Sequence, residues 1–241
     1  NVMTFDKQSE TGFSLVEVIV ALAILTTSTA ITVPIIARNR WQVDVDRYAT
    51  QLETGLYGLR AKLGSRKTSC LITFPTGFNF LEPRKITEFS KGENTETDFK
   101  CCDSEISSLT NDPDCKNGYD GHKISEKTGR PLDNLRLVQT ESTPESKNVR
   151  VAFISTKSKD EEDMSDFGFT PPGTTARAGS LTFLICHHKS ASENNSMKCI
   201  QNKNKLSTRC VKIEGNGAIE RGRWVTDTGS VVTANGHCQT T

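Results

Sequence analysis

The sequence has little net charge and few aromatic residues. Its 30 Lys and Arg are balanced by 29 Asp and Glu, so the net charge of +1 offers no bulk attraction for nucleic acid or for an acidic substrate. Aromatic residues make up 7% of the chain, and hydrophobic residues reach only 34%, below the usual share in a globular domain. We therefore expect a modest core surrounded by polar loops.

Motifs of catalysis are missing as well. The glycines are scattered in turns and do not form a Walker or dinucleotide-binding loop. Cys186, His187 and His188 adjoin in sequence, but with Cys199 and Cys210 they fit no common zinc template, and adjacent side chains on a strand point to opposite faces. No acid is identifiable that would orient a Cys/His nucleophile pair. We expect no metal, no cofactor and no catalytic activity.

One long apolar run stands out against this polar background. Residues 13–37 read FSLVEVIVALAILTTSTAITVPIIA and carry one charge, Glu17. As a helix this run spans roughly 37 Å, enough to cross a hydrocarbon core of about 30 Å. A buried core helix would be shorter and show a polar face. A secretory signal peptide would have a basic start and a shorter apolar stretch. We therefore predict a membrane-spanning helix.

Glu17 is unusual in such a helix. A carboxylate inside a membrane helix costs about 2.5 to 3.5 kcal/mol on insertion scales and usually has a partner. Cleavage of the chain just before Phe13 would create an α-amino group four residues from Glu17, one helical turn away. The position of the carboxylate thus points to a proteolytic step that creates its partner.

The stretch Gly12-Phe13-Ser14-Leu15-Val16-Glu17 resembles the prepilin signature of type IV pilins, with Glu at the fifth mature position. Pro34 falls at the twenty-second mature position, where many pilins also have a proline. The resemblance implies that prepilin peptidase cuts between Gly12 and Phe13 and that Phe13 is then N-methylated. It also implies that Glu17 pairs with the Phe13 amine of a neighbouring subunit during assembly.

The organisation that we expect is α+β, with a long N-terminal helix packed on an antiparallel sheet and long polar, disulfide-tethered loops. Residues 1–12 form the leader, 13–37 the transmembrane helix, 38–64 an amphipathic stem and 65–241 an extracytoplasmic domain. The stem is predicted from apolar residues at three- and four-residue spacing, namely Val45, Tyr48, Leu52, Leu56, Leu59 and Leu63.

The helical part contains a proline, Pro34, and two arginines directly after the apolar run. Pro34 removes a backbone hydrogen bond and should kink or loosen the helix. The resemblance implies that the region before it can unwind when subunits pack. Arg38 and Arg40 directly follow the apolar run, and the positive-inside rule alone would place them in the cytoplasm. The pilin interpretation places them outside, and we give more weight to the composite signature.

Short β-like runs follow the stem. They are rich in Val, Ile, Phe and Thr and lie at Cys70–Phe74, Leu135–Gln139, Asn148–Ser155, Leu181–Cys186, Arg209–Ile213 and Ser230–Thr233. A Gly-Asn-Gly turn within CVKIEGNGAIERGRW predicts a hairpin. Residues 82–134 and 156–180 read as polar loops, and the second loop holds an acidic run at 160–163 that we interpret as solvated surface.

All eight cysteines follow the apolar run. They are Cys70, Cys101, Cys102, Cys115, Cys186, Cys199, Cys210 and Cys238. An even number on one side of a membrane segment favours disulfides in an oxidising compartment over free or metal-binding thiols. Eight cysteines allow 105 connectivities. Bridges from Cys101 or Cys102 to Cys115, and from Cys186 to Cys199, are two guesses.

The resemblance narrows toward GspH/FimT-type minor pseudopilins, on the stem-to-strand segment QLETGLYGLRAKLGSRKTSCLITF and the Cys-led, basic segment 209–223. It implies a single-pass inner-membrane subunit that assembles with other pilins into a pilus or a type II secretion pseudopilus. Prepilin peptidase and an inner-membrane assembly platform are the expected partners.

A binding role on a pilus, for DNA uptake or surface adhesion, is the alternative. Its candidate DNA contacts are Arg209, Lys212, Arg221 and Arg223, although ordinary solvent-facing charge is the simpler interpretation of these four residues. A single-pass membrane enzyme is a third class, and it would keep an uncleaved N-terminus.

Overall fold

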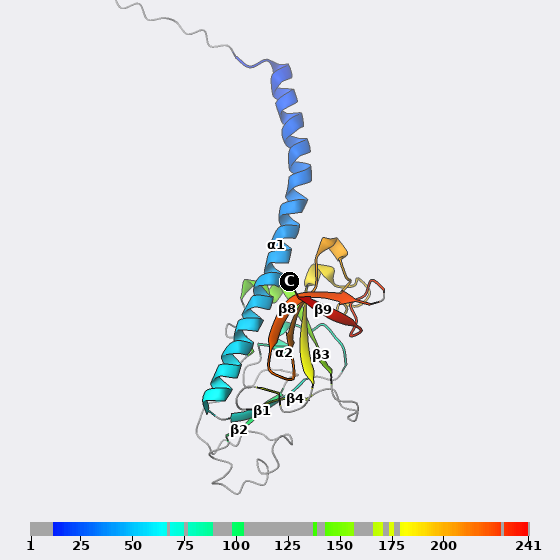
Figure 1. The fold of residues 1–241 in the computed structure, drawn as a ribbon. Coiled ribbons are helices and arrows are strands. Elements are labelled where there is room, and N and C mark those ends of the chain that lie inside the picture. Colours follow the sequence, from blue (N-terminus) through cyan, green and yellow to red (C-terminus); the bar gives the residue numbers. More distant parts are fainter. Residues whose placement is uncertain are drawn as a thin grey trace, which may run out of the picture. The chain divides into compact units, whose positions relative to one another are not determined.

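The computed structural model consists of two compact units, Asn1–Arg40 and Trp41–Thr241. It describes residues 12–66, 68–74, 77–88, 98–103, 137–138, 143–156, 166–170, 174–175, 179–227 and 229–240. Figure 1 shows the ribbon.

A single helix, α1 (Leu15–Arg66), begins in the first unit and ends in the second (Figure 1). It continues through Pro34, so the expected loosening at this proline does not break the helix. In the second unit, five of the six apolar stem positions are buried: Val45, Tyr48, Leu52, Leu56 and Leu59. The side chain of the sixth, Leu63, lies outside the described part of the chain. The predicted amphipathic stem is confirmed.

The larger sheet has five antiparallel strands in the order β3-β6-β7-β8-β9. These strands are β3 (Val149–Thr156), β6 (Ser180–His187), β7 (Arg209–Ile213), β8 (Ile219–Thr226) and β9 (Gly236–Thr240). The interior strand β6, which lies between β3 and β7, is buried along its whole length. The predicted hairpin is confirmed, because β7 pairs with β8 across the turn that contains Asn216, and the Gly217 N–H donates to the Glu214 carbonyl at 2.8 Å.

The smaller antiparallel sheet has the order β2-β1-β4-β5. Its strands are β1 (Thr68–Thr73), β2 (Asp98–Asp103), β4 (Asp166–Thr170) and β5 (Thr174–Thr175). Short helices lie between the strands: α2 (Pro83–Ile86), α5 (Pro144–Asn148), and the 3-10 helices η3 (His188–Ser190) and η4 (Lys203–Lys205). The α+β organisation is confirmed.

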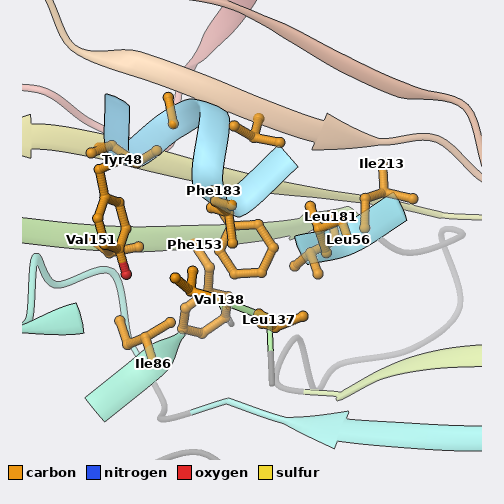
Figure 2. Close-up of a cluster of buried hydrophobic side chains, with 14 of the residues drawn as sticks. Tyr48, Leu56, Ile86, Leu137, Val138, Val151, Phe153, Leu181, Phe183 and Ile213 are labelled. Carbon is orange, nitrogen blue, oxygen red and sulfur yellow. The ribbon is translucent and has the colours of Figure 1, made fainter. Parts of the chain in front are cut away.

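Alternate residues of the larger sheet build two hydrophobic clusters. On β6, Phe183 belongs to the cluster that includes the buried stem residues of α1, whereas Leu184 belongs to the other. Figure 2 shows Phe183 and Phe153 facing Tyr48 and Leu56 of the helix. The second cluster closes the opposite face and contains Trp224 together with buried Phe, Ala, Leu, Val and Cys side chains. Period-two alternation thus gives β6 two buried faces.

Several predicted boundaries are wrong. Leu137 and Val138 form a bend rather than a strand, and both side chains are buried in the core. The Leu137 backbone packs against Gly55 of α1, where a Cβ would lie 1.6 Å from the Leu137 carbonyl oxygen. In the predicted strand at 230–233, Val231 makes only an isolated bridge to Ile200. The supposed polar loops contain α2, β2, β4 and β5. The acidic run at 160–163 lies outside the described residues.

Candidate functional site

The start of α1 is organised by a serine and Glu17. Ser14 directly precedes the first helical residue, and its backbone N–H donates to Glu17 Oε2 at 3.4 Å. Serine followed three residues later by glutamate is the capping-box pattern, in which the carboxylate satisfies an unpaired N–H at a helix start. A negative charge here also complements the positive end of the helix dipole. Sequence reasoning missed this local role, although S-x-x-E was visible.

The same carboxylate lies next to the predicted cleavage point. Gly12 and Phe13 precede Ser14 in a non-helical stretch, and Phe13 is 84% exposed. An amine generated at Phe13 would therefore be adjacent in sequence to the N–H that Glu17 now contacts. The carboxylate of Glu17 therefore lies within about one helical turn of the predicted cleavage point and of the amine that cleavage would create.

The apolar run that follows is a helix with exposed apolar side chains. Leu15 is 75% exposed and Ile31 is 66% exposed. The hydroxyls of Thr26, Thr27, Thr29 and Thr32 donate to carbonyls three or four residues earlier. Such back-bonding satisfies the polar groups within the helix, as lipid requires. By length and composition, α1 is the one helix in the described part of the chain that could cross a membrane.

The four candidate DNA contacts do not form a free patch. Arg209 contacts Asp46 of α1 at 2.5 Å, and Arg221 contacts Glu53 of α1 at 3.1 Å. Arg223 donates to Asn202 at 2.7 Å. The structure thus brings these arginines to the helix and a neighbouring loop, where each has a partner.

Lys212 lies apart from the three arginines. It pairs with Glu214, and strand alternation places its side chain on the opposite face of β7 from Arg209. A cavity of about 250 Å³ opens where Asp46, Arg209 and Arg221 meet over Ala49. Its two guanidinium groups already have carboxylate partners, so its walls present no free cation.

Two disulfides are described. Cys186 bonds Cys199, which confirms one predicted pair, with Cα atoms 6.6 Å apart. Cys210 bonds Cys238, a pair that we did not predict, with Cα atoms 5.9 Å apart. The backbones of Cys70, Cys101 and Cys102 lie in β1 and β2, but their side chains, and all of Cys115, lie outside the described part of the chain. The pairing guessed for them stays a prediction.

The two adjacent histidines are arranged differently from the expectation. Their rings stack with centroids 4.5 Å apart, because β6 ends at His187 and η3 begins at His188. Strand alternation therefore does not separate them. Across the residues that the structure describes, no group of three or more His, Cys, Asp or Glu side chains is arranged to hold a metal ion.

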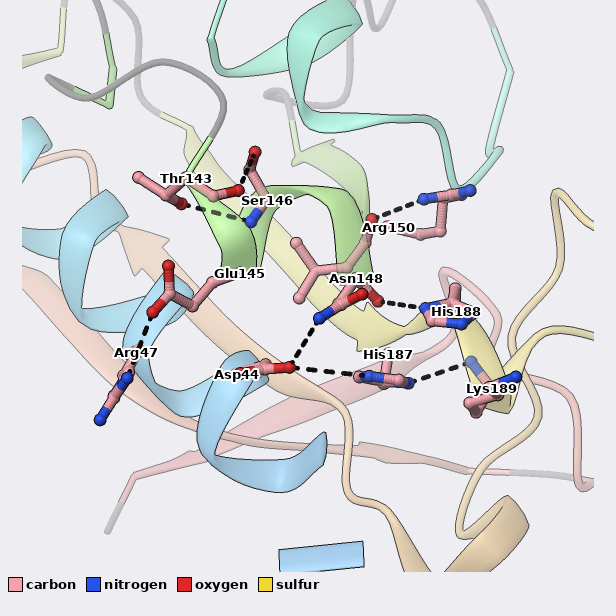
Figure 3. A network of polar contacts seen from close by, with 11 residues as sticks. Asp44, Arg47, Thr143, Glu145, Ser146, Asn148, Arg150, His187, His188 and Lys189 are labelled. Atoms are coloured by element: carbon pink, nitrogen blue, oxygen red, sulfur yellow. Dashed lines mark hydrogen bonds and ion pairs between the residues drawn. The ribbon is translucent and has the colours of Figure 1, made fainter. Parts of the chain in front are cut away.

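Sequence reasoning missed a buried polar network around His187, shown in Figure 3. The imidazole is 1% exposed, and its Nδ1 accepts from the Lys189 N–H at 3.1 Å, so Nε2 carries the proton in the neutral ring. Nε2 lies 4.0 Å from Asp44 Oδ2 of α1. That oxygen accepts from Asn148 Nδ2 at 2.9 Å.

This network ties the stem to the sheet. The indole of Trp41 stacks on the imidazole of His187 with centroids 5.7 Å apart. Burial, followed by the charges of His188, Lys189 and Arg150, lowers the pKa of His187 from 6.5 to about 4. The ring is therefore neutral at physiological pH. Its contacts position the first turns of α1 within the globular unit.

Comparison with known protein families gives one match. Residues 7–33 match the prokaryotic N-terminal methylation motif, and this match includes Gly12, Phe13 and Glu17. No curated protein and no solved structure matches the chain significantly. Type IV pilins, which this motif marks, are structural proteins rather than enzymes. The chain therefore carries the type IV pilin signature and is a type IV pilin-like precursor of the kind that prepilin peptidase processes.

Proposed function

We propose that the chain is a minor type IV pilin or pseudopilin. Prepilin peptidase removes residues 1–12, residues 13–37 anchor the subunit in the inner membrane, and residues 38–64 form the stem. Residues 65–241 lie outside the cytoplasm. An assembly platform then adds the subunit, with other pilins, to a pilus or a type II secretion pseudopilus. The observation that carries the proposal is the Glu17 carboxylate at the start of an exposed apolar helix, directly after Gly12–Phe13.

The chemistry of that carboxylate supports assembly. Among the residues that the structure describes, the one hydrogen bond to the Glu17 carboxylate comes from the Ser14 N–H, at 3.4 Å. A charge in lipid or in a filament core is costly without a partner and strongly attracted to an opposite charge. The Phe13 amine of a neighbouring subunit supplies that partner. Pairing of the two groups selects one register between subunits.

The disulfides support an extracytoplasmic globular unit. Cys186–Cys199 and Cys210–Cys238 both help to close the face of the larger sheet opposite the stem. Disulfides persist in oxidising compartments and are rare in the cytosol. A minor role is supported by the long polar stretch between β1 and β3, since a densely packed shaft tolerates bulk poorly. The GspH/FimT subtype stays a prediction.

Glu17→Ala tests the assembly step. We expect this variant to insert in the membrane and to be cleaved, but to be absent from sheared filaments or pseudopili. Glu220→Ala is a matched control, because it removes an exposed carboxylate from β8 and leaves the helix start intact. Incorporation of Glu17→Ala at the control level would contradict the role of the carboxylate. Incorporated amounts are measured by quantitative mass spectrometry of the sheared material.

The binding alternative remains a second proposal with its own test. Salt-sensitive binding of duplex DNA, lost on changing Arg221 and Arg223 to Gln, would support it. The ion pair between Arg221 and Glu53 instead supports a structural role for this arginine. Under that role Arg221→Gln lowers the free energy of unfolding by less than about 1 kcal/mol, as expected for a partly exposed ion pair, and leaves DNA binding unchanged.

A further inference from the structure

Unpaired cations gather at one end of the larger sheet. Among described side chains of the globular unit, four lysines make no hydrogen bond or ion pair, and all four are exposed. They are Lys147, Lys189, Lys198 and Lys205, and we call them the lysine face. The other cations whose side chains the structure describes in this unit have partners, as Arg47 has in Glu145 and Lys203 has in Glu193.

Lys147 and Lys189 lie next to the paired ends of two strands, β3 and β6. Lys147 lies in α5, two residues before Val149, and Lys189 lies in η3, two residues after His187. Val149 and His187 are directly paired in the register of β3 and β6. The His188 Nδ1 also lies 3.0 Å from the carbonyl oxygen of the residue that follows Lys147. The two lysines therefore flank the same end of the sheet.

Lys198 and Lys205 are held at this end by the loop that follows β6. The side chain of Asn204, next to Lys205, donates to the Lys189 carbonyl oxygen at 3.1 Å. Lys198 precedes Cys199, which is bonded to Cys186 near the end of β6. The Asn204 and Lys205 backbones have positive φ of 57° and 59°, a conformation that non-glycine residues rarely adopt without surrounding constraint.

Nearby carboxylates do not neutralise this face. Glu145 and Glu193 contact Arg47 and Lys203 at 3.2 Å and 3.4 Å. Asp44 accepts from an amide, and its side chain is 22% exposed, so it offsets the charge only partly. The described part of this end thus carries a surplus of exposed positive charge.

The same end of the sheet is where the chain enters the globular unit. Trp41, the first residue of that unit, stacks on His187. Trp41 lies four positions after the end of the apolar run at 37, and α1 is helical over this stretch, so the two positions are about 6 Å apart along the helix. Chain connectivity alone therefore tethers the lysine face close to any membrane that residues 13–37 cross.

We propose that the lysine face docks on anionic phospholipid headgroups while the subunit is anchored in the membrane before assembly. This inference rests on the proposed function. Each lysine near an anionic surface strengthens association roughly fivefold, and the attraction decays within a Debye length. Arg38 and Arg40 agree with this proposal. The positive-inside rule does not explain two arginines on the outer side of the membrane, but an anionic lipid surface would attract them there.

The test uses the full chain, purified from a host with prepilin peptidase and reconstituted in vesicles. One set of vesicles contains phosphatidylcholine alone, and the other also contains phosphatidylglycerol. The rate at which an amine-reactive acetylating reagent modifies each lysine is measured by mass spectrometry. We expect Lys147, Lys189, Lys198 and Lys205 to react several-fold more slowly in anionic vesicles at low salt, and equally at high salt. Lys212, paired with Glu214, is the internal control.

A triple Lys→Gln variant at 189, 198 and 205 should weaken association on the order of a hundredfold and abolish the protection of Lys147. The matched variant R84Q/K85Q/K212Q removes the same charge elsewhere and should keep that protection. Equal acetylation rates in the two kinds of vesicle would overturn the proposal. Protection by duplex DNA, but not by anionic lipid, would assign the face to nucleic acid and also overturn it.

The mass of the N-terminus, measured in the same sample, distinguishes failure of the lysine-face proposal from failure of the pilin proposal. A chain that begins at Phe13 but shows no lipid-dependent protection refutes the lysine face and leaves the pilin function intact. A chain that keeps residues 1–12 refutes the pilin function itself, whatever the lysine rates are.

Discussion

Lowering the pH from 7 to 5 should destabilise the globular unit through His187. The imidazole is 1% exposed, and burial is the main reason why its pKa falls from 6.5 to about 4. As the pH drops below 6.5, the unfolded chain binds a proton that the folded protein does not bind until about pH 4. The contribution to stability is therefore complete above pH 6.5 and disappears progressively as the pH falls toward 4.

The magnitude follows from the two pKa values. A difference between 6.5 and about 4 corresponds to a total loss of about 3 kcal/mol, of which about 2 kcal/mol falls between pH 7 and pH 5. Glu145 does not interfere in this window. Backbone hydrogen bonding, with a smaller contribution from Arg47, lowers the pKa of Glu145 from 4.5, so its carboxylate stays ionised above pH 5.

The assay is denaturant unfolding of the full chain in mild detergent at pH 7, 6 and 5. Tryptophan fluorescence reports the transition, because Trp41 stacks on His187 and Trp224 lies in the second core cluster. His187→Asn is the comparison, since its amide oxygen can accept from the Lys189 N–H in place of Nδ1. We expect the wild type to lose about 2 kcal/mol more than this variant between pH 7 and pH 5.

Two results would refute the reasoning. Equal losses in the wild type and His187→Asn would show that this ring does not control the pH dependence. Stability that rises toward pH 5 in the wild type alone would show a stronger effect of Asp44. Its carboxylate oxygen, 4.0 Å from His187 Nε2, would then stabilise the imidazolium more than burial, His188 and Lys189 destabilise it.

Two further predictions concern the packing of the globular unit, and both are measured by denaturant unfolding. Gly55→Ala should cost about 3 kcal/mol or more, because its Cβ would lie 1.6 Å from the Leu137 carbonyl oxygen; a loss under about 1 kcal/mol would contradict that placement. Replacing Cys210 and Cys238 by Ala should cost about 3 to 4 kcal/mol, since their disulfide links residues 28 apart. Unchanged unfolding in this variant would show that the bond does not form.

Strongly periodic segments were predictable from the sequence. The three- and four-residue spacing from Val45 to Leu59 determines which face of a helix is buried, and no tertiary information is needed to recognise it. The hairpin of β7 and β8 was also predictable, because Gly215-Asn216-Gly217 supplies a turn between two strand-like segments.

The polar strands were not predictable for a physical reason. β9 reads GHCQT, and none of its residues is buried, so its pairing with β8 rests on backbone hydrogen bonds that any sequence can make and on the Cys210–Cys238 disulfide, which the sequence alone could not pair. At Leu137 and Val138 the opposite happened, because a strand was predicted where the structure has a bend. They are apolar enough to suggest a strand, yet they bury their side chains in a bend against the helix.

In the candidate site, too, the local motif was predictable from the sequence and the long-range contacts were not. Gly12, Phe13 and Glu17 form a local motif, so the sequence and the family match agree on it. The His187 network joins Asp44 of α1 to Asn148 of α5 and His187 of β6, each more than a hundred positions from Asp44, and no local pattern in the sequence indicates their proximity. The partners of Arg209 and Arg221 are likewise determined by how the helix lies on the sheet.

The mass of the mature N-terminus, measured on protein isolated from its native membrane or filament, tests the pilin interpretation most directly. We predict a chain that begins at Phe13 and carries a methylated α-amino group. Protein that still contains residues 1–12 would lack the amine that Glu17 is expected to pair with, and would contradict the assignment.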